Sequence, residues 1–96
     1  MRKSNEQSLG EVIKELLKSS GLDKKLAQHK LIEGWAEVVG ETIARHTLEV
    51  KIFDDKLYVK MNSSVIREEL NYVKSGLVQK LNELAGEKLI EDIVIR

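Results

Sequence analysis

Residues 34–45 of the chain read Gly34-Trp35-Ala36-Glu37-Val38-Val39-Gly40-Glu41-Thr42-Ile43-Ala44-Arg45. Trp35 is the single tryptophan, and it shares an apolar helical stripe with Ile32 and Val39, so it fixes where this helix meets the rest of the fold. Gly40 interrupts the stripe, and glycine costs about 1 kcal/mol relative to alanine inside a helix. The stretch therefore predicts a helix that bends or breaks at Gly40 and continues as a short helix to Arg45.

Two helices are predicted around and before this stretch. Residues 1–7 lack apolar anchors, and we expect them to be flexible. Ser8 and Glu11 have the spacing of a capping box ahead of an apolar helical face, and Gly21 is expected to end that first helix in the left-handed conformation. Asp23 is the expected cap of the second helix, which contains Trp35.

After Arg45 the period of the apolar residues changes from 3.6 to 2. Leu48, Val50 and Ile52 alternate with polar residues, as do the apolar residues of the run 57–61, and Asp54-Asp55 separates the two runs. This pattern is typical of an antiparallel hairpin with one buried face.

A long helix and a final strand complete the chain. Ser63-Ser64 can cap the helix, whose apolar stripe runs to Leu84 before Gly86 ends it, and residues 89–96 are rich in β-branched side chains. A right-handed crossover then places the last strand parallel to one hairpin strand. The predicted fold class is α+β in the order α-α-(α)-β-β-α-β, with a small three-stranded mixed sheet and helices packed on one face, in one domain over residues 8–96.

Composition limits the function classes. The chain has 96 residues, 16 Lys and Arg, 16 Asp and Glu, and no cysteine, which excludes disulfides and thiolate zinc sites. The balanced charge argues against tight, autonomous DNA binding, since that needs clustered cations. No apolar run approaches a membrane span or a signal peptide, so we expect a cytoplasmic protein without a membrane partner.

The residue pattern favours a protein that is not an enzyme. His29 and His46 have no further ligands at metal spacing, and the latter is better explained at a helix-to-strand corner. The adjacent carboxylates, such as Asp54-Asp55, do not face one another as an acid–base dyad needs. Ser63-Ser64 has no obvious base. We therefore expect no catalytic residues, metal, cofactor or small-molecule substrate.

Basic residues offer the only candidate site. A strand face with lysines and a tyrosine could hold single-stranded nucleic acid through phosphate contacts and stacking. The alternative is a solvated face whose lysines prevent edge-to-edge aggregation. Two aromatic residues are candidate anchors, Tyr58 and Trp35, although the stripe favours a core position for the latter. The candidate nucleic-acid contacts are Lys24, Lys25, Lys30, Lys51, Lys60, Arg67 and Lys74.

The order of elements resembles a KH-like domain, a fold associated with single-stranded nucleic acid. The Gly-x-x-Gly loop of nucleic-acid-binding KH domains is absent from the chain. An RNA-binding domain of KH-like form is one function that this resemblance implies.

A closer resemblance covers roughly residues 8–96 and is carried by the joint order and spacing of corner and core elements. These elements are Trp35, Val39-Gly40, Ile43-Ala44, His46-Thr47, Leu57 with Val59, Ser63-Ser64, Glu69-Leu70, Leu81-Asn82, Gly86, and Ile90 with Ile93. In these elements the chain resembles the bacterial family of DciA-type loaders of the replicative helicase, long described as a domain of unknown function. The resemblance implies a KH-like adaptor in DNA replication that contacts the replicative helicase and single-stranded DNA. A third hypothesis is a structural interaction module, such as a homodimer formed through an open sheet edge.

Overall fold

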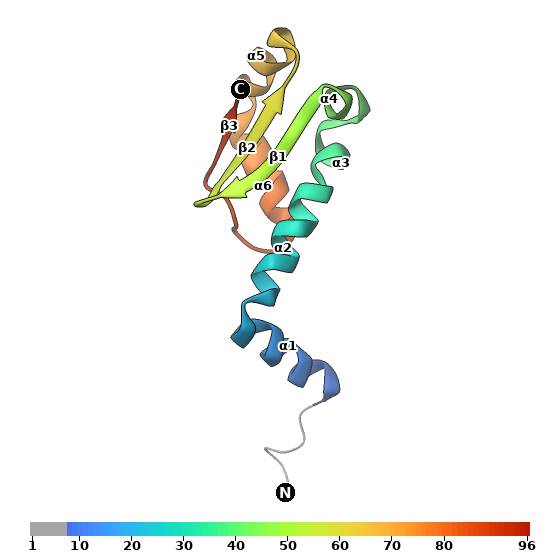
Figure 1. Cartoon of the computed structure of the whole chain (residues 1–96), viewed down its shortest axis with the longest axis vertical. Helices are drawn as coiled ribbons and strands as arrows, with labels where there is room; N and C mark the ends of the chain where they lie inside the picture. Colours follow the sequence, from blue (N-terminus) through green and yellow to red (C-terminus); the bar gives the residue numbers. More distant parts are fainter. Residues whose placement is uncertain (1–7) are drawn as a thin grey trace, which may run out of the picture.

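The computed structural model describes residues 8–96, so the expectation of a flexible segment over residues 1–7 lies outside the described residues (Figure 1). The described chain is α+β, as the sequence predicts. Its elements are α1 (Leu9–Ser20), α2 (Leu22–Glu33), α3 (Trp35–Val39), α4 (Glu41–Arg45), β1 (Thr47–Phe53), β2 (Lys56–Met61), α5 (Ser64–Tyr72), α6 (Lys74–Ala85) and β3 (Asp92–Ile95).

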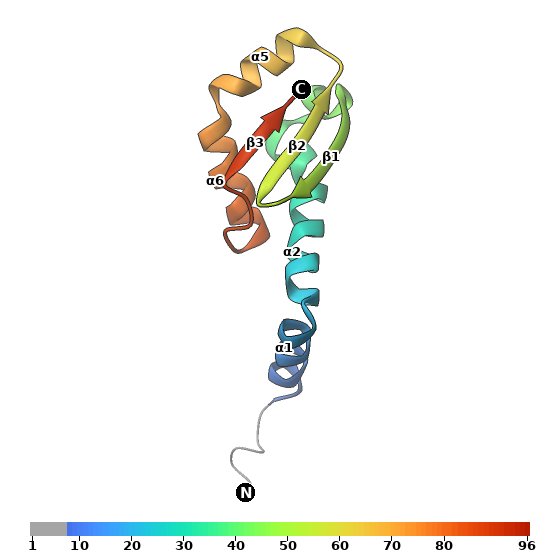
Figure 2. The ribbon, with the colours of Figure 1, turned by 60° about the vertical axis from the view of Figure 1, so that its left-hand side comes forward.

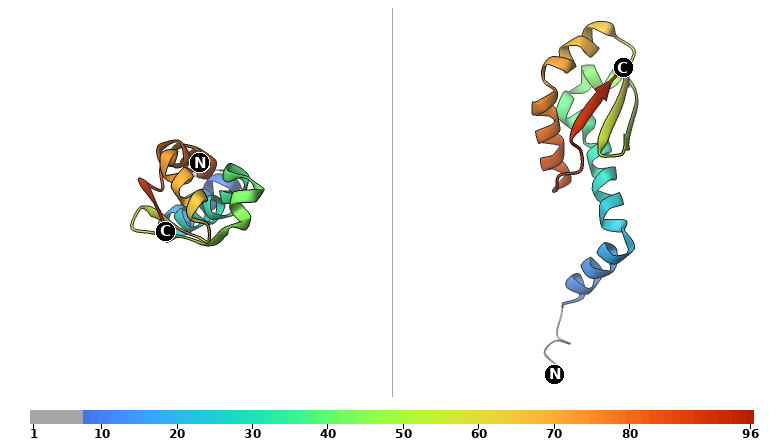
Figure 3. Two further views of the ribbon diagram at one scale, coloured as in Figure 1. Left: turned by 90° about the horizontal axis from the view of Figure 1, so that it is seen from above. Right: turned by 90° about the vertical axis from the view of Figure 1, so that its left-hand side faces the viewer.

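The three strands form a mixed sheet in the order β1-β2-β3. β1 pairs antiparallel with β2, and β3 pairs parallel with β2, which confirms the predicted hairpin and the predicted parallel pairing of the last strand. Asp54 and Asp55 take φ values of 52° and 63° in the hairpin turn, a conformation that aspartate tolerates better than most residues. The helices pack on one face of the sheet, and the other face is open in Figures 2 and 3.

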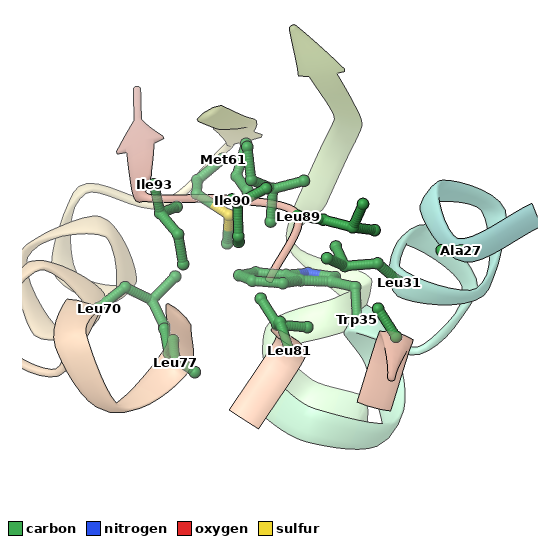
Figure 4. Packing of buried hydrophobic residues seen from close by; sticks show 13 residues of the cluster. Ala27, Leu31, Trp35, Met61, Leu70, Leu77, Leu81, Leu89, Ile90 and Ile93 are labelled. Carbon is green, nitrogen blue, oxygen red and sulfur yellow. The ribbon is translucent and has the colours of Figure 1, made fainter. Parts of the chain in front are cut away.

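The core lies between this sheet and the helices behind it (Figure 4). Trp35 is only 3% exposed, and its Nε1–H donates a 3.0 Å hydrogen bond to Thr47 Oγ1. Thr47 Oγ1 in turn donates to the carbonyl of Ile43 at 2.8 Å. A tryptophan buries a large apolar area but usually needs a partner for its N–H, and this chain of bonds supplies one. The indole therefore fixes α3 and α4 against the start of β1.

The predicted second helix is divided into α2 and α3 at Gly34, where α6 packs closely. A Cβ on Gly34 would lie 1.8 Å from Leu84 Cδ2 and 3.1 Å from both Leu84 Cγ and the carbonyl oxygen of Lys30, so a larger residue would have to displace the Leu84 side chain. Further along, Gly40 takes φ 93° and separates α3 from α4, as predicted. The sequence pattern predicts the break at Gly40, because this glycine interrupts an apolar stripe. It does not predict the break at Gly34, because Leu84, which packs there, is distant in sequence.

The predicted long helix is also divided, into α5 and α6 at Val73. Val73 has φ −116° and ψ 18°, and its N–H bonds to the carbonyl of Leu70 at 3.1 Å. The bend keeps both Leu70 and Leu77 buried while the chain turns around the end of the sheet (Figure 2). The prediction of one continuous helix was wrong because its stripe continues through the bend without glycine or proline. The order α-α-(α)-β-β-α-β therefore becomes α-α-α-α-β-β-α-α-β.

Three further local predictions were wrong. Gly21 is both the left-handed residue after α1 and the residue before α2, so Asp23 lies within the first turn of α2 and is not its cap. A bulge near the start of β1 leaves Leu48 58% exposed, although the alternation predicts it on the buried face. The final strand begins at Asp92 because the side chain of Asn82 holds the preceding backbone in a loop.

Candidate nucleic-acid interface

The open face of the sheet brings together cationic and aromatic side chains from β1, β2, α5 and the residue that follows β3. Along β2, Leu57 and Val59 are buried, so Tyr58 and Lys60 project from the opposite face. The registers place Lys51 of β1 beside Tyr58, so its side chain shares that face. We call this the open face; a shallow hollow on it is lined by Glu49, Lys51, Tyr58, Lys60, Arg67 and Arg96, together with the edges of two buried residues.

Arg96 lines this hollow from the residue that follows β3. Its guanidinium carbon is 5.3 Å from the centre of the Tyr58 ring, within the range of a cation–π contact. Two hydrogen bonds to β2 hold the backbone of Arg96. Its N–H donates to Val59 O at 3.0 Å, and its carbonyl accepts from Met61 N–H at 2.7 Å. The Arg96 side chain thus extends the aromatic surface of Tyr58 with a planar cation.

Charge on the open face is predominantly positive. Four cations, Lys51, Lys60, Arg67 and Arg96, line the hollow against the single carboxylate of Glu49. Lys51 Nζ lies 3.9 Å from Glu49 Oε2, and both side chains are more than half exposed, so this pair is weak and leaves the lysine available. Arg67 reaches the same hollow from α5, which crosses the end of the sheet (Figure 2).

The structure does not bring every predicted contact to this face. Lys24, Lys25 and Lys30 are exposed on α2, which lies on the helical side of the sheet and extends beyond it (Figure 1). Lys74 is at the start of α6, with Nζ 3.6 Å from Asp92 Oδ1. Trp35 lies in the core, so its ring is not presented on the open face. The predicted contacts that do share the open face are Lys51, Tyr58, Lys60 and Arg67.

Arg96 is the residue that sequence reasoning missed. A signal was present, because Ile93 and Ile95 occupy alternate positions of the last strand and Arg96 falls on the opposite side from them. The parallel register places Val94 beside Tyr58 and thus fixes which face Arg96 joins. That register depends on the crossover geometry, which the sequence pattern alone does not give.

The arrangement suits a flexible anionic chain with planar groups. Bases stack on aromatic rings and on guanidinium planes alike, while lysine and arginine around them hold phosphates. Among residues 8–96 no group of three or more His, Cys, Asp or Glu side chains is arranged to hold a metal ion. Within the same described range, no helix has the length and apolar character needed to cross a membrane.

Comparison with known proteins gives a family. The model described as "Dna[CI] antecedent, DciA" matches residues 8–95. A UPF0232 protein of Corynebacterium glutamicum is 29% identical over 89 residues, covering 93% of this chain and 50% of its own length. A UPF0232 protein in the recF-gyrB intergenic region of Mycolicibacterium smegmatis is 30% identical, covering 93% and 46%.

The chain thus spans about half the length of the curated relatives it matches. No solved structure matches it, so the KH-like label stays a prediction. The family model, by contrast, covers almost all of the described residues. The chain therefore belongs to the DciA family.

Proposed function

We propose that this chain is a non-enzymatic adaptor that contacts the replicative helicase and holds single-stranded DNA weakly on its open face. Family membership supports a role in bacterial DNA replication in general, and the family is non-catalytic and associated with replication. The name of the family model suggests an association with the helicase. Its place of action in this proposal is the cytoplasm, where the bacterial chromosome is copied.

The observation that carries the DNA contact is the Arg96–Tyr58 pair in the hollow of the open face. Arg96 provides a stacking plane and a positive charge at one point, and Lys51 and Lys60 project from the neighbouring positions of the sheet. A base can stack on the pair while its flanking phosphates meet the lysines. Arg67 extends the cationic surface along the end of the sheet.

Weak binding follows from the charge count. The chain has zero formal net charge, so long-range attraction to DNA is small and the affinity depends on the local cations. If four cations neutralise four phosphates, the logarithm of the affinity should fall against the logarithm of salt with a slope of about −3 for a single strand. Binding should therefore be measurable at low salt and be lost near physiological salt.

The helicase contact is tested by retention of the host's replicative helicase on the immobilised chain. We expect the helicase to be retained at micromolar concentrations of both proteins, and its absence there would contradict the adaptor hypothesis. Because the relatives are about twice as long, the same experiment should include any longer form of the protein.

The DNA contact is tested by fluorescence anisotropy with a labelled oligothymidylate at low salt. Arg96→Ala and Tyr58→Leu should each weaken binding by about tenfold, since base stacking contributes on the order of 1–3 kcal/mol. Lys80→Ala, which removes an exposed cation of α6 on the helical side, is the matched control and should leave the affinity unchanged. Equal losses in all three variants would contradict a localised site.

An RNA oligonucleotide of the same base composition tests the RNA-binding alternative in the same assay. If the chain binds the RNA more tightly, and excess unlabelled DNA does not displace the RNA, RNA binding is favoured over the DNA proposal.

The variants Lys24→Ala, Lys25→Ala and Lys30→Ala test whether α2 adds a second nucleic-acid contact. We expect them to have little effect, because α2 lies on the covered side of the sheet.

A further inference from the structure

The helix α1 has an apolar face that the described chain leaves uncovered. None of residues 9–20 is buried by the rest of residues 8–96, and Leu9 and Leu16 are 76% and 62% exposed. Val12 and Ile13 lie on the same face. Figure 1 shows α1 projecting from the far end of α2, away from the sheet, in a molecule 63 Å long.

Exposed apolar side chains also occur at the start of α2, where Leu22 and Leu26 follow the bend at Gly21. We call residues 8–26 the arm. Single exposed leucines are ordinary in a monomer, but a series on successive turns of α1, followed by two more at the start of α2, marks an interaction surface.

Local sequence makes α1 a helix but does not make it stable alone. Ser8 and Glu11 form a complete capping box, with Glu11 N–H bonded to Ser8 Oγ and Ser8 N–H bonded to Glu11 Oε1. A helix of 12 residues is nonetheless marginal in water without packing on its apolar face. The arm therefore needs a partner to be persistently ordered.

The charges of the arm indicate which partner fits. Glu11 and Glu15 lie in its first half, and Lys18, Lys24 and Lys25 lie in its second half. Two arms that run antiparallel bring the acidic half of each beside the basic half of the other. Two parallel arms would instead place like charges together.

The net charge of each half agrees with this. Residues 8–16 carry two Glu and one Lys, a net charge of −1, and residues 17–26 carry three Lys and one Asp, a net charge of +2. Antiparallel packing also sets the two helix dipoles in opposite directions, which is the favourable arrangement. We propose that the arm docks on the arm of a second copy of this chain, antiparallel, to form a symmetric dimer.

A lipid surface is a poorer fit to the same face. Helices that lie on membranes carry an excess of Lys and Arg on the polar side and often Trp or Phe on the other. The polar side of α1 has two Glu and two Lys, and residues 8–26 contain no aromatic residue. The nearly balanced, polarised charge therefore favours self-association.

The oligomeric state is tested by sedimentation velocity over a range of concentrations. The chain should dimerise with a dissociation constant in the micromolar range, and Leu16→Gln should weaken the dimer by at least about tenfold. Glutamine keeps high helix propensity, so this variant removes apolar surface and not the helix. Val65→Gln is the matched control, because Val65 lies outside the arm and is 68% exposed. This variant should change the dissociation constant of the dimer by no more than about twofold.

The orientation is tested by cross-linking, for which the absence of native cysteine is an advantage. Glu11→Cys mixed with Lys24→Cys should be joined by a short bis-maleimide, whereas Glu11→Cys alone should stay largely unlinked. Efficient linking of Glu11→Cys to itself would show a parallel pair and overturn the proposal. A chain that sediments as a monomer at every concentration, or a dimer that Val65→Gln weakens as much as Leu16→Gln does, would overturn it as well.

Discussion

The helices α6 and α1 carry the same kind of apolar stripe and meet opposite surroundings. On α6, Leu77, Leu81 and Ala85 are buried against the sheet and the helices beside it. On α1, the corresponding apolar face is exposed to solvent. A helical period therefore predicts which side of a helix is apolar but not what covers that side. The crossover places the sheet against α6, whereas we propose that a second copy of the chain covers α1.

The largest effect should come from shortening one leucine in each stripe. Leu81 is fully buried, so Leu81→Ala should lower the free energy of unfolding by about 2–5 kcal/mol. Leu16→Ala, on α1, should change it by less than about 0.5 kcal/mol in the dilute monomer. Urea unfolding followed by circular dichroism measures both, and a similar loss for the two variants would show that α1 is packed on the domain after all.

A smaller loss of stability should come from a substitution at Gly34, against which α6 packs. Gly34→Ala should destabilise the fold by about 1–3 kcal/mol, because its Cβ would collide with the Leu84 side chain. Gly76→Ala is the matched control inside α6 itself, where nothing lies within 4 Å of the added Cβ. It should stabilise the fold by roughly 0.5–1 kcal/mol through helix propensity.

The double variant Gly34→Ala with Leu84→Ala isolates the cause of that loss. If the collision is responsible, the two changes together should cost less than the sum of their separate costs. Strict additivity would indicate that Gly34 is needed for its backbone and not for the close approach of α6.

The smallest effect on global unfolding should come from the cap of α1. Ser8→Ala removes one side of the capping box, which contributes on the order of 1 kcal/mol to helix formation. Because α1 is nearly unburied, the loss should appear as faster hydrogen exchange of its amides and not in the unfolding midpoint. Ser63→Ala, at the cap of α5 on the folded domain, is the matched control and should lower global stability.

Sequence reasoning predicted the elements that depend on local chemistry. Nearby residues predict the core position of Trp35, the hairpin turn at Asp54-Asp55, the left-handed Gly21 and the helix end at Gly86, and the structure confirms each of them. The mixed sheet was predicted from the order strand, long helix, strand, because such a crossover returns the last strand parallel to a strand of the hairpin. The α+β class and the mixed three-stranded sheet could therefore be predicted, whereas two of the helix breaks could not.

The missed features depend on contacts between distant residues. The break at Gly34 lies where Leu84 of α6 approaches the backbone, and the break at Val73 lies where the chain turns around the end of the sheet. The candidate site was predictable in part, since alternation placed Lys51, Lys60 and Tyr58 on one face. Arg96 joins them only through the parallel register of β3, and no pattern along the chain states that register.

A nuclear magnetic resonance titration can show residue by residue whether the open face is a nucleic-acid interface. Adding oligothymidylate at low salt should shift the amide signals of Lys51, Tyr58, Lys60 and Arg96, while those of Leu77 and Leu81 in α6 stay in place. Chemical-shift changes confined to α2 or the arm, without changes in β2 and Arg96, would contradict a nucleic-acid interface on the open face. The absence of any change at millimolar oligonucleotide would contradict it as well.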